Sequence, residues 1–111
     1  MTDMQLAGEN RRDADRATIP SGALVRVLRI VNQKGLHARA SARFVQTVEK
    51  FEAQVRVTRG NETVLGTSIM GLMMLAAGPG TEITVTACGR ERAEVLHALE
   101  LLVNGRFGED E

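Results

Sequence analysis

One histidine, His37, lies in a segment whose residue types could carry phosphoryl chemistry. The segment reads Asn-Gln-Lys-Gly-Leu-His-Ala-Arg over residues 32–39. It falls between an apolar run typical of a strand and a run with helical spacing, so we expect His37 where a helix begins. Free backbone N–H groups and the helix dipole favour an anion there. An unprotonated imidazole can attack a phosphoryl group, so the sequence predicts a phosphohistidine site.

The neighbours of His37 admit more than one interpretation. Gly35 allows a tight turn into the helix. Arg39 could hold phosphoryl oxygens through paired donors, although most arginines on a first helical turn are simply solvated. Arg43 is expected at the surface. A lone histidine at a helix start is itself more often a capping or surface residue, and its placement between Gly35 and Arg39 is what favours chemistry.

A second candidate segment begins at Ser68. Either Thr67 or Ser68 could cap a short helix, and Ser68 could instead be phosphorylated, because a phosphate is electrostatically favoured at a helix start. The apolar residues that follow are too many for one face of a short helix. They predict either a fully buried helix or a partner-docking patch, for which flexible Met side chains are suited. The predicted docking residues are Ile69, Met70, Met73 and Met74.

The remaining reactive side chains suggest no further site. His97 lies inside a predicted helix and is expected to be exposed or at a boundary. His37 has no acidic or thiol neighbour in the sequence, so we expect no metal site and no cofactor. Cys88 has no activating neighbour and is expected to be structural. As the one cysteine in the chain it cannot form an internal disulfide, which suits the cytoplasm.

Hydrophobic spacing predicts the elements that position these residues. Alternating or β-branched runs predict strands at 24–31, 53–58, 63–65 and 82–87, and helical spacing predicts helices at 38–51, 69–77 and 91–103. Arg59 to Glu62 is expected as a hairpin turn, and Asn104-Gly105 as a helix stop. This order predicts an α+β two-layer open-faced sandwich, with a four-stranded antiparallel sheet and three helices on one face.

Composition limits the function classes. The 111 residues fit one small domain, predicted at 23–108, between a disordered tail at 1–22 and an acidic end at 109–111. The net charge of +0 and the aromatic fraction of 3% argue against a nucleic-acid-binding domain. We see no targeting signal and no run long enough to span a membrane, so we expect a cytoplasmic protein.

Two segments resemble the signatures of the HPr family, the histidine phosphocarriers of the bacterial phosphoenolpyruvate-dependent phosphotransferase system. Gly-Leu-His-Ala-Arg at 35–39 resembles the family's active-site signature, and Ser-Ile-Met-Gly-Leu-Met at 68–73 resembles the signature around its regulatory serine. The resemblance covers about residues 24–107. The family usually has proline where this chain has Ala40, and we expect the site to survive because alanine is also a good helix former. The ending at 104–110 resembles the nitrogen-related branch of the family.

The resemblance implies a phosphocarrier rather than a complete enzyme. His37 would accept a phosphoryl group on Nδ1 from phospho-enzyme I and pass it to a IIA-type protein, in sugar uptake or nitrogen-related regulation. Arg39 would support the phosphorylated form, and Ser68 would match the serine modified by HPr kinase/phosphorylase. The apolar helix would dock donor and acceptor, and nothing requires more than a monomer. The alternative is a regulatory binding module, switched by phosphorylation at Ser68 with His37 idle.

Overall fold

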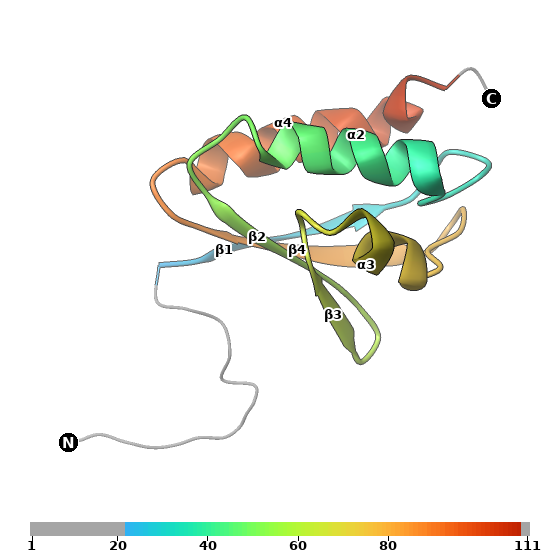
Figure 1. Ribbon diagram of the computed structural model, residues 1–111, viewed down its shortest axis with the longest axis horizontal. Coiled ribbons are helices and arrows are strands. Elements are labelled where there is room, and N and C mark those ends of the chain that lie inside the picture. Colours follow the sequence, from blue (N-terminus) through green and yellow to red (C-terminus); the bar gives the residue numbers. More distant parts are fainter. Residues whose placement is uncertain (1–21, 110–111) are drawn as a thin grey trace.

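A four-stranded antiparallel sheet with helices packed on one face forms the fold (Figure 1). The computed structural model describes residues 22–109, and the sheet has the strand order β1-β4-β2-β3. The predicted two-layer α+β sandwich is therefore confirmed. Its elements are β1 (Leu24–Arg29), α2 (Ala38–Val48), β2 (Gln54–Arg59), β3 (Glu62–Leu65), α3 (Ile69–Met74), β4 (Glu82–Cys88), α4 (Arg92–Asn104) and the 3₁₀ turn η1 (Arg106–Gly108).

Alternation of side chains along the central strands builds one layer of the core. In β4, Ile83, Val85 and Ala87 are fully buried, and the residues between them are partly exposed. Val85 is the register partner of Val57 in β2 and of Arg26 in β1. Since side chains of period two share one face of a sheet, this pattern directs the apolar face of the sheet toward the helices.

The two long helices cover the apolar face of the sheet and complete the core. Residues at helical spacing on α2 and α4 are buried against the sheet, as their sequence pattern predicts. The buried apolar residues are Ala40, Phe44, Val45 and Val48 on α2, and Val95, Leu96, Leu99 and Val103 on α4. The 3₁₀ turn η1 follows α4 and contacts α2, and in this turn Phe107 is fully buried.

Several element ends differ from the predicted ones. The helix predicted over 38–51 ends at Val48, because Lys50 and Phe51 bond to carbonyls three residues earlier and tighten the chain into a turn. The strand predicted over 24–31 ends at Arg29, and the helix predicted over 69–77 ends at Met74. Cys88 belongs to β4, where it pairs with Gln54. The tail predicted over 1–22 lies outside the described residues, apart from Gly22.

Candidate functional site

His37 is the N-cap residue of α2. Its backbone is extended, with φ −75° and ψ −176°, and its carbonyl accepts the first helical hydrogen bond, from Ser41 N–H at 2.8 Å. Its Nδ1 accepts a hydrogen bond from the backbone N–H of Arg39 at 3.3 Å. The imidazole therefore lies against the free amides at the start of the helix, where backbone dipoles favour an anion.

A tight loop delivers His37 to this position. Gly35 has φ +65°, and a Cβ at this residue would lie 2.3 Å from the carbonyl oxygen of Ala77. The same carbonyl accepts a hydrogen bond from Leu36 N–H at 3.0 Å, while the Ser41 hydroxyl donates to Leu36 O at 3.1 Å. Glycine is required here because the loop combines a left-handed backbone with close contact to another segment.

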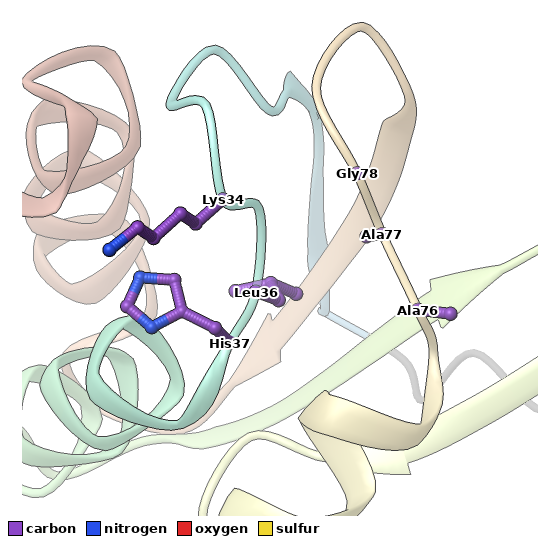
Figure 2. Close-up of a pocket in the computed structure, with 6 residues that line it drawn as sticks. All are labelled: Lys34, Leu36, His37, Ala76, Ala77 and Gly78. Carbon is purple, nitrogen blue, oxygen red and sulfur yellow. The ribbon is translucent and has the colours of Figure 1, made fainter. Parts of the chain in front are cut away.

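A hollow of about 200 Å³ opens beside the histidine. Figure 2 shows Lys34 and His37 leaving the loop in the same direction, with the 76–78 segment on the other side of Leu36. The Lys34 ammonium therefore adds positive charge near the imidazole. The hollow is lined by Lys34, Leu36, His37, Ala76, Ala77 and Gly78.

Glu109 is an acidic neighbour of His37 that sequence reasoning missed. Its Oε2 hydrogen-bonds to His37 Nε2, and its Oε1 accepts from Asn32 Nδ2 at 3.0 Å. The side chain of Glu109 is 9% exposed and that of His37 is 26% exposed. The interpretation that His37 lacks an acidic neighbour is therefore wrong, because folding brings together residues 72 positions apart.

Arg43 helps to hold the turn that carries Glu109. Its guanidinium donates to the backbone carbonyl of Phe107. The predicted surface role of Arg43 is wrong in this respect, since its side chain is half-buried and links α2 to η1.

Two other predicted site residues lie at the starts of α2 and α3. Arg39 lies on the first turn of α2 and is exposed. Ser68 is the N-cap of α3, and its Oγ accepts from Gly71 N–H at 2.9 Å. Of the two predicted caps, Thr67 and Ser68, the structure therefore has Ser68. Helix α3 packs against α2.

Side chains on α3 divide into a buried and an exposed set. Leu72 is fully buried and Leu75, the C-cap, is nearly so. Of the two predicted alternatives, the fully buried helix is therefore wrong, because part of this apolar run is exposed. The exposed set, called here the α3 patch, consists of Ile69 (42%), Met70 (70%), Met73 (42%) and Met74 (72%).

The remaining candidates lie apart from His37. His97 is exposed on α4, as predicted, and Cys88 Sγ donates to Gln54 Oε1 at 3.7 Å. Within residues 22–109, no three His, Cys, Asp or Glu side chains are grouped so that they could hold a metal ion. Among the described helices, none is long and apolar enough to cross a membrane.

Comparison with known proteins covers the sheet, the loop before α2 and the helices of this arrangement. The family model described as "PTS HPr component phosphorylation site" matches residues 24–105. The phosphocarrier protein HPr of Neisseria meningitidis serogroup A is 51% identical over 84 residues, covering 76% of this chain and 94% of that protein. The phosphocarrier protein HPr of Cupriavidus necator is 46% identical over 82 residues, which cover 74% of this chain and 92% of that protein.

Solved structures agree with the sequence matches. HPr-C-His from Thermoanaerobacter tengcongensis has a TM-score of 0.76 at 39% identity and covers 79% of this chain and 99% of that one. HPr from Bacillus anthracis has a TM-score of 0.72 at 36% identity, and the match covers 75% of this chain and 99% of that one. Since these matches span the sheet, the helices and the loop before α2, the chain belongs to the HPr family, the phosphocarrier proteins of the phosphotransferase system.

Proposed function

We propose that His37 accepts a phosphoryl group on Nδ1 from phospho-enzyme I and passes it to a IIA-type protein. The observation that carries this proposal is the hydrogen bond from Arg39 N–H to Nδ1 at 3.3 Å. A backbone amide only donates, so Nδ1 presents a lone pair. In the attack this lone pair forms the N–P bond, while the bond from phosphorus to the donor breaks and its electron pair stays on the donor.

Hydrogen-bond donors and cations near the His37 ring support the phosphorylated state. Once the N–P bond forms, the Arg39 amide is free to donate to a phosphoryl oxygen at the start of α2. The exposed Arg39 guanidinium can add paired donors, and Lys34 lines the hollow beside the ring. Positioning and charge stabilisation account for most of the catalysis in phosphoryl transfer, and a small carrier can supply its share of both.

We assign the docking of enzyme I and of the IIA-type acceptor to the α3 patch. Its four apolar side chains are exposed on a helix that packs against α2, the helix that begins after His37. We place this relay in the cytoplasm, with the protein acting as a monomer. The resemblance of residues 104–110 to the nitrogen-related branch suggests regulation rather than sugar uptake.

Incubation with enzyme I and phosphoenolpyruvate, followed by intact-mass spectrometry, tests the proposal. The wild-type protein should gain one acid-labile phosphate and lose it to a IIA-type acceptor. His37→Ala should gain none, whereas the control His97→Ala, which changes an exposed histidine, should behave as wild type. Acid-labile phosphate on His37→Ala would overturn the assignment. An unmodified wild-type protein, tested with its cognate enzyme I, would overturn the relay itself.

A regulatory binding module is the second candidate, favoured by the position of Ser68. This residue begins α3 and directly precedes Ile69 of the α3 patch, so phosphate added there by an HPr kinase/phosphorylase would place negative charge beside the apolar residues. Target binding that changes with Ser68 phosphorylation and persists in His37→Ala would support this function. Binding that follows only the state of His37 would exclude it.

A further inference from the structure

The imidazole of His37 has a hydrogen-bonding partner at each nitrogen. Nδ1 faces the Arg39 amide and Nε2 faces Glu109 Oε2. Because the amide can only donate, Nδ1 must accept, and the proton of the neutral ring must lie on Nε2. The Glu109 carboxylate accepts that proton, so the two contacts select the same tautomer.

A buried amide holds Glu109 in this position. Asn32 is fully buried, and its Nδ2 donates to Glu109 Oε1 at 3.0 Å and to Gly35 O at 2.9 Å. Both acceptors are oxygens, which fixes the orientation of the amide. Asn32 thereby ties the carboxylate to the same loop that delivers His37. A charge-assisted hydrogen bond at a carboxylate that is only 9% exposed is stronger than one at the surface.

We infer that Glu109 is a positioning residue that keeps the ring proton on Nε2 of His37 throughout phosphoryl transfer, an inference that rests on the phosphocarrier function proposed above. When the Nδ1 lone pair attacks phosphorus, the ring becomes positively charged and the carboxylate stabilises that charge. No proton has to leave Nε2. The nearby cations are Lys34, which lines the hollow beside the ring, and Arg39, on the first turn of α2.

The same contact keeps the phosphoryl group transferable. In the second transfer, the N–P bond breaks and its electron pair returns to Nδ1 as the acceptor's nucleophile bonds to phosphorus. With the proton held on Nε2, the leaving group is neutral imidazole. Without that proton it would be imidazolate, a much more basic and poorer leaving group. Loss of Glu109 should therefore slow transfer to the acceptor and also slow the hydrolysis of phosphorylated His37.

Two variants separate the charge of Glu109 from its hydrogen bond. Glu109→Gln keeps an oxygen for the ring N–H but removes the charge, and Glu109→Ala removes both. Glu94→Ala is the control, because Glu94 is an exposed acid on α4. All three should fold like the wild type, as judged by their circular dichroism spectra.

Imidazole ¹H–¹⁵N spectra of the unphosphorylated proteins test the geometry without any partner protein. The wild type and Glu94→Ala should show a slowly exchanging Nε2–H resonance of His37. That resonance should weaken in Glu109→Gln and be lost to exchange in Glu109→Ala. An unchanged resonance in Glu109→Ala would overturn the inference, whether or not the protein proves to be a phosphocarrier.

Kinetics then test the consequence. At mildly alkaline pH, phosphorylated Glu109→Ala should transfer to a IIA-type acceptor about tenfold more slowly than wild type, with Glu109→Gln between them. Its spontaneous hydrolysis should also be slower, whereas a merely loosened site would hydrolyse faster. Equal or faster hydrolysis would overturn the inference and leave the proposed function standing. If wild-type protein takes up no phosphate on His37, the proposed function fails and the positioning role fails with it.

Discussion

The guanidinium of Arg43 on α2 donates a hydrogen bond to the backbone carbonyl of Phe107, 64 residues further along the chain. Phe107 is fully buried although its φ is +55°, a left-handed conformation that is uncommon for residues other than glycine. The neighbouring Arg106 has φ +60°. Burial of the Phe107 ring and the bond from Arg43 therefore hold a turn that its own backbone preferences disfavour.

Removing this bond should destabilise the protein measurably. Arg43→Met keeps most of the apolar stem but leaves the Phe107 carbonyl unpaired, so the free energy of unfolding should fall by about 1.5 kcal/mol. Urea denaturation checks this value. Arg90→Met is the control, because Arg90 forms a surface ion pair with Glu52 at 3.1 Å and should lose at most about 0.5 kcal/mol. Equal losses in the two variants would show that the link to η1 contributes nothing.

Glycine substitutions should separate backbone strain from steric contact in the loop before His37. Gly35 and Gly60 have φ values of +65° and +61°, but only at Gly35 would a Cβ meet other atoms, at 2.3 Å from Ala77 O. Gly60→Ala should therefore cost about 1 kcal/mol of unfolding free energy and Gly35→Ala about 3 kcal/mol. Thermal or urea denaturation of both variants measures the difference. Similar costs would contradict close packing of the loop on Ala77.

The N-cap of α3 should tolerate aspartate in place of Ser68 but not alanine. Ser68 Oγ accepts from Gly71 N–H at 2.9 Å, and alanine lacks this acceptor. Ser68→Ala should lower the free energy of unfolding by about 1 kcal/mol, while Ser68→Asp, which can also cap, should lose little. Chemical denaturation again gives the comparison. If Ser68→Asp loses as much as Ser68→Ala, the hydroxyl is not acting as a cap.

Charge placed in the α3 patch should weaken partner binding without unfolding the protein. Met70 and Met74 are 70% and 72% exposed, so lysine at either position should leave stability nearly unchanged. Each variant should bind enzyme I about tenfold more weakly, because a charge would be buried in the apolar contact. Isothermal titration calorimetry measures the affinity. The control is Leu101→Lys, at an apolar residue that is 60% exposed on α4, and an equal loss there would exclude specific docking on α3.

Local sequence rules were sufficient for the half of the site that lies around His37. A glycine, a capping residue and a helical repeat act within a few positions of one another, and so the loop, the N-cap and α2 could be predicted. Ser68 as the cap of α3 follows from the same short-range chemistry.

Long-range packing explains what could not be predicted. Glu109 meets His37 because α4 ends at Asn104 and η1 turns back toward α2. The left-handed residues in that turn are Arg106 and Phe107, neither of which carries the glycine signal that marks such a conformation. Arg43 looked solvated because its partner is a backbone carbonyl, which no side-chain pattern reveals.

The central place of β4 sets the order in which this chain can fold. Leu24 of β1 pairs with Ala87 of β4, whereas the β2–β3 hairpin pairs residues close in sequence. Contacts between distant segments form slowly, because a long loop must close before they are gained. The sheet should therefore close late in synthesis, once residues 82–88 have emerged from the ribosome. The loop that presents His37 hydrogen-bonds to Ala77 through Leu36. We therefore expect a nascent chain to place His37 in its reactive position only when most of the chain has been made.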